Sequence, residues 1–192
     1  MKRAWMCVAA ATAATVWGGA AWAQQQLVPA QSEIVFVSRQ MGVPVEGRFR
    51  NFTAQVAFDP AKPAASRIAF TVDVASATLG VRETDAELPK PVWFNTARFP
   101  QATFQSNSVK AAGPGKFEVA GKLTIKGVSS DVVVPVTLAQ PAGPSGTTTA
   151  TGAFPIKRLT FKIGENEWAD TSTVADDVQV RFKLALTGVG KL

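Results

Sequence analysis

The chain has 192 residues, of which 46% are hydrophobic and 18% are charged, and its formal net charge is +6 at pH 7. It contains no histidine, no tyrosine and one cysteine. These counts exclude Ser-His-Asp and Cys-His catalytic systems and the ordinary zinc and copper sites. The basic residues form no run, which favours solubility over nucleic-acid binding. We therefore expect a protein that is not an enzyme and that binds neither metal nor nucleic acid.

Residues 1–23 have the features of a cleaved export signal. A short positive segment precedes an apolar run, and Ala21-Trp22-Ala23 supplies the small residues that signal peptidase requires. The alternative is an uncleaved membrane anchor, although a run made mostly of Ala and Gly holds weakly in lipid. Cleavage removes Cys7, so residues 24–192 are expected to form one periplasmic domain without a disulfide.

Apolar and polar residues alternate with a period of two through most of the remaining chain. The last run is the clearest, because Val178, Val180 and Phe182 share one face and Gln179 lies opposite. One apolar and one polar face is typical of antiparallel sheet, whereas the strands of parallel α/β folds are apolar on both faces. Turn residues such as Lys126-Gly127 separate the runs.

Only residues 79–98 lack this alternation. Within them, Val81–Leu88 predicts about two helical turns, which Pro89 and Pro91 end. The chain is therefore predicted to be all-β, a single antiparallel β-barrel of about eight strands with one short helical crossover. A barrel of this size is either filled by its own side chains or hollow enough for one small ligand, and alternation alone does not distinguish the two or exclude a two-sheet sandwich.

Several motifs resemble one known family in the right order along the chain. The most specific are Phe99-Pro100-Gln101-Ala102-Thr103-Phe104 and Gly121-Lys122-Leu123-Thr124-Ile125-Lys126-Gly127, and Asp176-Asp177-Val178 follows near the end. Residues 24–192 thereby resemble the YceI-like proteins over nearly their whole length. The resemblance implies a lipocalin-like barrel, periplasmic or secreted and without general catalytic activity, that holds a polyisoprenoid or another long-chain amphiphile. The chain departs from the family at Arg158–Gly164, where the usual Arg-Ser-Asp-Phe-Gly element is altered, and it lacks the histidines that often flank the first strand.

The inward faces of the predicted strands supply a candidate apolar lumen. Twelve phenylalanines without a tyrosine suit a lumen with few polar anchors. For any single position core packing is the plainer interpretation, and a register slip of one residue would reverse the two faces. The residues expected to line the lumen are Phe36, Phe52, Phe58, Phe70, Phe104, Phe117, Leu123, Phe154, Val180 and Phe182.

Arg158 is the first candidate for holding a polar headgroup. It shares the inward parity of Phe154 and Ile156 at the predicted mouth of the barrel, where a guanidinium suits a phosphate or a quinone carbonyl. The alternative is an ion-paired arginine or one that extends to solvent. The weaker headgroup candidates are Arg39, Arg82 and Lys157.

The acidic clusters are assigned to solvent. Glu83, Asp85 and Glu87 fall on the short predicted helix, and the acidic residues within 165–177 lack the order of a calcium-binding loop. No catalytic residue is proposed, because the carboxylate or lysine that a lipid-modifying enzyme would need in the lumen is not predicted to point there.

These features predict a periplasmic binding or carrier protein that sequesters a long-chain isoprenoid lipid or quinone in the barrel. The alternatives are a structural or interaction module with a solid core, a fatty-acid- or amide-binding protein, and a lipid-modifying enzyme. The expected partners are a long-chain amphiphilic lipid and, transiently, a membrane or membrane protein. The chain is expected to act as a monomer or homodimer, without a cofactor unless the bound isoprenoid or quinone is counted as one.

Overall fold

The computed structural model of the chain describes residues 25–141 and 146–192. The predicted export signal, with Cys7, lies outside these ranges. Eleven strands form one antiparallel sheet. They are β1 (Gln26–Leu27), β2 (Glu33–Gln40), β3 (Val43–Phe49), β4 (Phe52–Ala57), β5 (Arg67–Asp73), β6 (Ala77–Thr78), β7 (Gln101–Gly113), β8 (Lys116–Ile125), β9 (Val128–Ala139), β10 (Thr148–Lys157) and β11 (Asp177–Thr187).

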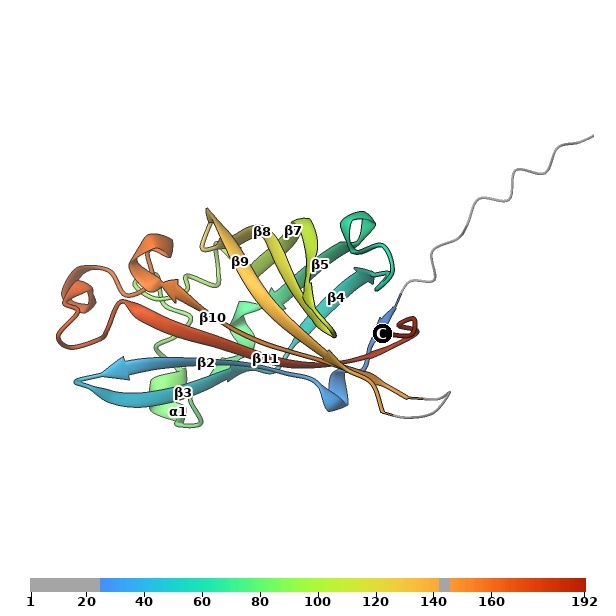
Figure 1. The fold of residues 1–192 in the computed structure, drawn as a ribbon. Helices are drawn as coiled ribbons and strands as arrows, with labels where there is room; N and C mark the ends of the chain where they lie inside the picture. The colour runs from blue at the N-terminus through green and yellow to red at the C-terminus, as the bar shows by residue number, and fades with distance from the viewer. Residues whose placement is uncertain (1–24, 142–145) are drawn as a thin grey trace, which may run out of the picture.

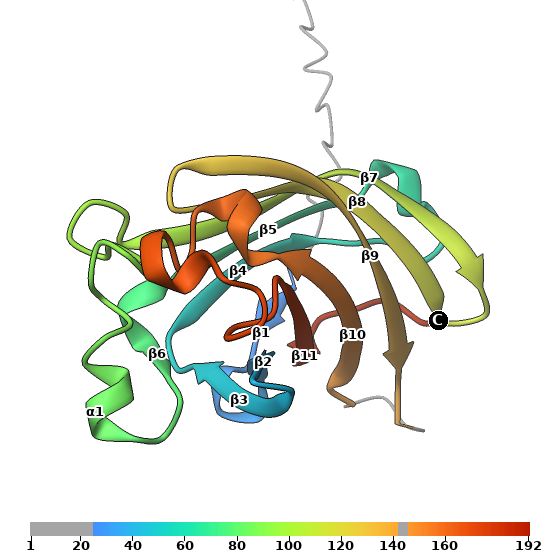
Figure 2. The ribbon, with the colours of Figure 1, turned by 90° about the vertical axis from the view of Figure 1, so that its left-hand side faces the viewer.

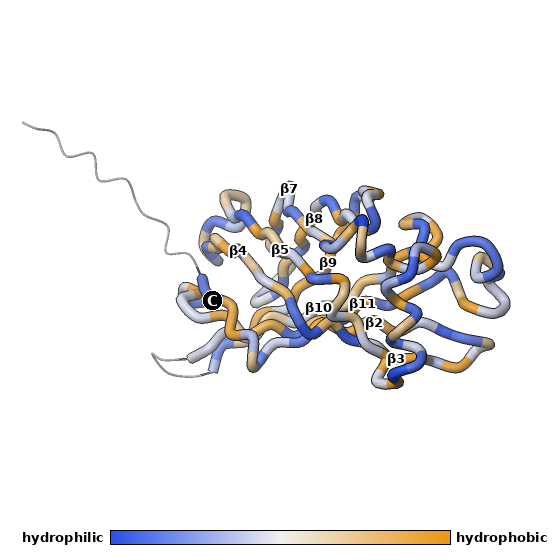
Figure 3. The backbone as a smooth tube through the Cα atoms, turned by 180° about the vertical axis from the view of Figure 1, so that it is seen from behind, coloured by the Kyte–Doolittle hydropathy of each residue, from blue (hydrophilic) through white to orange (hydrophobic). Residues whose placement is uncertain are grey.

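The sheet runs in the order β4-β5-β7-β8-β9-β10-β11-β2-β3-β6 and curls into an open half-barrel (Figures 1 and 2). Hydrophobic and hydrophilic residues alternate along the strands, because one face of the sheet turns inward and the other faces solvent (Figure 3). The all-β, barrel-like prediction is confirmed. The predicted number of about eight strands is wrong, because the sheet path has ten strands and β1 pairs with β11 beside it.

One end of the half-barrel is closed by the start of the described chain. Gln26 and Leu27 pair with the end of β11, and the Gln25 amide donates a 3.0 Å hydrogen bond to the Val56 carbonyl on β4. Gln25 Oε1 also accepts from the Phe58 amide at 2.7 Å. Residues 25–27 therefore form a strap that connects β11 to β4 at this end. The sheet path does not pair these two strands with each other.

The opposite end, which we call the mouth, is shaped by loops. The β2–β3 hairpin, the crossover that contains α1 (Arg82–Asp85), and the segment 158–176 gather there (Figure 2). Within the described part of the chain, β9 and β10 pair only at Thr149–Gly152 with Val136–Ala139, and they diverge towards the mouth (Figure 1). The 3₁₀ helix at Arg158–Phe161 lies against β9 in this gap, and the Phe161 side chain is buried.

The crossover helix is shorter than predicted. α1 covers four residues, about one turn, where two turns were expected. The Asp85 carboxylate accepts hydrogen bonds from the Thr78 hydroxyl at 2.5 Å and from the Leu79 amide at 2.6 Å, which ties the helix to the strand before it. The chain then continues in turns that bury Leu88 and Phe94 beneath the mouth. Among the described residues, no helix has the length and apolar character needed to cross a membrane.

Three glycines on the inner face lie against phenylalanine rings of neighbouring strands. Gly47 faces Phe36, Gly152 faces Phe182, and Gly121 lies beside the ring of Phe104. A Cβ atom on any of the three would come closer to the ring than van der Waals contact allows. Because no Cβ is present, each ring lies against the wall rather than standing in the lumen, an arrangement known to stabilise glycine in sheets.

These contacts predict a graded response to alanine. A Cβ on Gly121 or Gly152 would also meet a backbone carbonyl, of Gln105 or Pro135, which cannot move aside easily. Gly121→Ala and Gly152→Ala should each lower the free energy of unfolding by about 2–3 kcal/mol, the upper part of the range for overpacking. Gly47→Ala, which meets only side-chain atoms, should cost less. Urea unfolding measures all three, and an equal cost for Gly47→Ala and Gly121→Ala would contradict this account.

Candidate functional site

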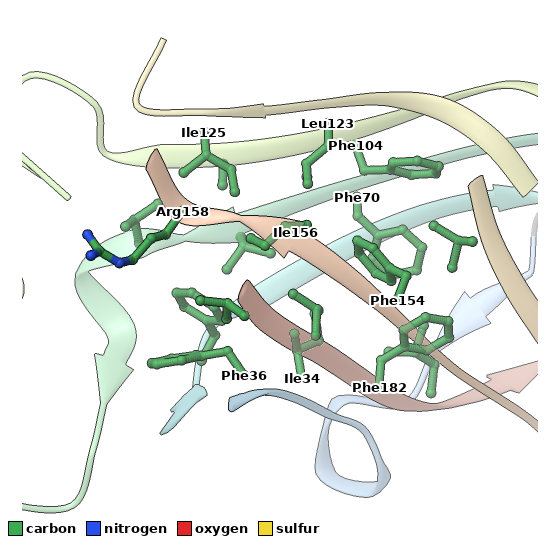
Figure 4. A pocket seen from close by; sticks show the side chains of 18 of the residues that line it. Ile34, Phe36, Phe70, Phe104, Leu123, Ile125, Phe154, Ile156, Arg158 and Phe182 are labelled. Carbon is green, nitrogen blue, oxygen red and sulfur yellow. The ribbon is translucent and has the colours of Figure 1, made fainter. Parts of the chain in front are cut away.

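The half-barrel holds a cavity of about 370 Å³. Side chains from strands all around the sheet, and from the crossover, point into it (Figure 4). The volume lies in the range typical of pockets for small molecules. The lining is apolar except for five residues, namely Ser38, Gln40, Thr84, Glu87 and Arg158.

Nine of the ten predicted lumen residues lie on the wall of this cavity. Phe52 is the exception, because it packs against the core beside the wall without lining the cavity. The nine are Phe36, Phe58, Phe70, Phe104, Phe117, Leu123, Phe154, Val180 and Phe182. The alternate residues expected on the inner face of these strands therefore lie on the inner face in the structure.

The wall exposes apolar surface to the interior of the molecule. Phe70, Phe104 and Phe182 belong to inward faces, yet each is only half-buried. Residues of a filled core would be covered completely, as Val109 is at 1% exposure. The alternative of a barrel with a solid core is therefore wrong.

The two ends of the cavity differ in polarity. At the strapped end Phe58 and Phe117 meet edge to face, with ring centroids 4.9 Å apart. Ser38, Gln40 and Thr84 belong to the segments at the mouth, and Glu87 lies beside them with its carboxylate 2.6 Å from Lys90 Nζ. A long apolar ligand would accordingly lie with its tail towards the strapped end and any polar head at the mouth.

Arg158 organises the segment 158–176 at the mouth. Its side chain is 2% exposed, and all five of its N–H groups donate to backbone carbonyls of this segment. Nε donates to Ala175 at 3.1 Å, Nη1 to Ile163 and Gly164 at 2.9 Å each, and Nη2 to Trp168 at 2.6 Å and Val174 at 2.7 Å.

The headgroup role expected for Arg158 is therefore corrected. Its position follows the inward parity of β10, but the guanidinium points away from the labelled apolar side chains of the cavity and has no N–H left to donate (Figure 4). Burial lowers the pKa of Arg158, and the nearby Asp176 carboxylate acts against that shift. Arginine remains charged under such conditions, so the residue is a buried cation that holds a loop.

The weaker headgroup candidates, unlike Arg158, do not line the cavity at all. Arg39 lies on β2 and Arg82 on α1, and both are exposed outside the lining. Lys157 is also exposed and pairs with Asp177 across the β10–β11 ladder at 2.8 Å, an interaction that raises the pKa of the lysine. Among the residues that line the cavity, no cation is free to bind an anionic head.

A second buried cation, Lys126, was missed in the sequence. It occupies the two-residue turn between β8 and β9, and its Nζ donates to the Lys162 carbonyl at 2.5 Å and to Glu165 Oε2 at 2.8 Å. The bond to Lys126 lowers the pKa of Glu165. The turn thus holds the segment 158–176 from outside while Arg158 holds it from within. In the sequence Lys126 belongs to the Gly121–Gly127 motif and to a turn, but neither feature indicates that its side chain is buried.

The role of Arg158 predicts that lysine cannot replace it. Lysine has three donors, so Arg158→Lys leaves at least two buried carbonyls without a partner, at about 1–3 kcal/mol each. We expect the free energy of unfolding to fall by roughly 3 kcal/mol. Lys157→Met, which removes an exposed ion pair from the adjacent position, should change it by less than about 1 kcal/mol. Equal stability of Arg158→Lys and wild type in urea would refute the assignment.

Comparison with known proteins places this geometry in a family. The family described as YceI-like domain matches residues 25–186. A UPF0312 protein of Ectopseudomonas mendocina is 32% identical over 121 residues, which are 61% of this chain and 63% of that protein. A second UPF0312 protein, from Azotobacter vinelandii, is 36% identical over 46% of each chain. The match thus spans less than two thirds of the length of these curated relatives.

Solved structures share the fold. The crystal structure of Burkholderia cenocepacia BcnA is 47% identical, with a TM-score of 0.79 over 83% of this chain and 99% of that one. A polyisoprenoid binding domain from Saccharophagus degradans, 17% identical, has a TM-score of 0.66 over 84% of this chain and 97% of its own, and this likeness shows the fold alone. Since the family match covers residues 25–186 and the structure has the same architecture, the chain belongs to the YceI-like family.

Proposed function

We propose that this protein is a periplasmic carrier that binds an isoprenoid lipid or another long apolar molecule with an uncharged head inside the half-barrel. The observation that carries the proposal is the hollow, apolar cavity with its few polar groups gathered at one end. The Saccharophagus degradans domain, whose name describes polyisoprenoid binding, supports the same class of ligand. The export signal expected in residues 1–23 supports the location.

The apolar wall supplies the free energy of binding. Each methylene removed from water contributes about 0.8 kcal/mol, so a dozen carbons contribute roughly 10 kcal/mol before the cost of association is subtracted. Subtracting an association cost of about 4 kcal/mol leaves roughly 6 kcal/mol, which corresponds to a dissociation constant in the micromolar range without any charged contact. A tail too long for the cavity would extend through the mouth, which keeps the affinity below the practical limit and permits release.

The uncharged head follows from the state of the polar groups on the wall. Arg158 has no N–H to offer, and Glu87 is paired with Lys90, so the wall supplies no free positive charge for a phosphate or a carboxylate. Ser38, Gln40 and Thr84 can exchange hydrogen bonds with a carbonyl or a hydroxyl. A quinone or a prenyl alcohol fits this lining better than a lipid phosphate, and a neutral amide fits it better than a fatty acid.

Binding rather than catalysis is the proposed activity. Among the residues that line the cavity, only Glu87 and Arg158 carry titratable side chains, and both are engaged with other parts of the protein. Asp85, two residues before Glu87, has its pKa lowered by hydrogen bonds from the Thr78 hydroxyl and the Leu79 amide. It therefore remains an ionised structural acceptor. A general acid or base would need a carboxyl group that the ligand can reach and whose pKa is raised towards neutral pH.

The test compares ligands that differ only in their heads. Purified protein is titrated with an isoprenoid quinone and with a polyprenyl phosphate of equal tail length, and complexes are counted by native mass spectrometry. We expect the quinone to bind at least about tenfold more tightly, a difference of roughly 1.4 kcal/mol. Binding of neither compound would refute the proposal, and tighter binding of the phosphate would refute the uncharged head.

A matched pair of variants shows whether the ligand lies in the cavity. Val180 points into the lumen, and its neighbour Gln179 is exposed on the outer face of β11. Val180→Trp should fill the cavity and weaken quinone binding by more than tenfold, whereas Gln179→Trp should leave it unchanged. If both variants bind the quinone as the wild type does, the site lies elsewhere.

A further inference from the structure

Exposed apolar side chains concentrate around the mouth. The described residues include six large hydrophobic side chains that are exposed, and four of them belong to the segments of the mouth. We call these four the mouth rim: Met41, Val43, Val81 and Trp168. The other two are Val133, on the outer face of β9, and Leu192 at the end of the chain. Single exposed hydrophobic residues need no explanation, but their concentration at the entrance to an apolar cavity does.

The mouth rim is continuous with the cavity. Trp168 itself lines the cavity and packs against Trp93, another lining residue, with ring centroids 5.4 Å apart and ring planes tilted by 43°. The Met41 amide donates to the Thr173 carbonyl at 2.8 Å, so the β2–β3 hairpin is attached to the segment that carries Trp168. The crossover with Val81 lies at the same end (Figure 2). Apolar surface therefore extends from the interior to the outside along Trp93 and Trp168, beside the polar groups of the mouth.

Met41 occupies a backbone position that methionine rarely adopts. It is the first residue of the two-residue turn between β2 and β3, with φ at 48°, and Gly42 follows with φ at 80°. Turns of this kind favour asparagine, aspartate or glycine at the first position. The side chain is 79% exposed, so packing within the protein does not compensate for the strain. An apolar side chain that is strained and exposed in this way points to a contact with something outside the folded chain.

The charges at the mouth indicate what kind of surface the rim meets. Residues 38–43, 79–98 and 157–177 together carry seven basic and eight acidic side chains. This near balance provides no attraction to an anionic surface or to a strongly charged protein. Tryptophan and methionine side chains, in contrast, partition well into the interface of a lipid bilayer, with tryptophan enriched there.

We propose that the mouth rim docks onto the surface of a lipid bilayer and presents the open cavity to the acyl-chain region. The inference rests on the proposed function, because a carrier of an apolar molecule must collect it from a membrane. With the rim inserted, the cargo moves between bilayer and cavity along apolar surface and never crosses water. Insertion depends on apolar side chains rather than on charge, so docking should be as strong on zwitterionic vesicles as on anionic ones, and insensitive to salt.

The test is flotation of the protein with phosphatidylcholine vesicles. Met41→Asn removes the most exposed rim side chain and places in the turn a residue that favours its backbone conformation, so the fold should be retained. We expect this variant to lose at least fivefold in vesicle partition while its affinity for soluble quinone changes less than twofold. Val133→Asn, which removes a side chain of 58% exposure away from the mouth, is the matched control and should float like the wild type.

The outcomes separate this inference from the proposed function. Wild type that binds quinone but does not float, or Met41→Asn that floats equally well, overturns docking and leaves the carrier function intact. Wild type that floats but binds no quinone overturns the carrier function. If Met41→Asn instead abolishes a dimer seen by analytical ultracentrifugation while neither protein floats, the rim is a contact between two copies, and bilayer docking is refuted.

Discussion

The close approach of phenylalanine rings to glycines on the inner wall is the constraint on which the site depends. Gly47, Gly121 and Gly152 let three of the rings lie along the wall, so the volume at the centre remains empty. The protein thereby keeps apolar surface away from bulk water without covering it with other side chains, and this unsatisfied surface is what a ligand would cover.

The shape of the mouth depends on a different interaction, in which every N–H group of the Arg158 guanidinium donates to a backbone carbonyl. A segment of almost twenty residues between β10 and β11 has little regular structure, yet five of its carbonyls converge on Arg158. Burying a cation is tolerated here because every donor has a partner. The entrance is thus rigid on the side built from this segment, where Trp168 is held by its own carbonyl, and the charge that holds it is hidden from any cargo.

The period-two pattern was sufficient to predict an antiparallel barrel-like fold and to place residues such as Phe70 and Val180 on its inner face. It missed β1 and β6, because strands of two residues show no alternation. For Arg158 the parity was correct and the role was not, since the direction of a guanidinium depends on carbonyls up to 17 residues away in the chain. Whether the lumen was hollow could not be predicted from composition. The isolated glycines within strands carried that information, because such glycines mark places where another group approaches the backbone.

The strap at residues 25–27 has a consequence for how the chain is made. β11, the last strand, lies between β10 and β2 and also receives β1, so Phe36 pairs with Val180 across most of the chain. Contacts of such long sequence separation form slowly and late. During synthesis β2 and β3 have no third strand beside β2 until the C-terminal residues emerge. The consecutive hairpins from β7 to β10 can form from neighbouring parts of the chain, whereas the half-barrel as a whole is completed only when β11 joins β10 to β2.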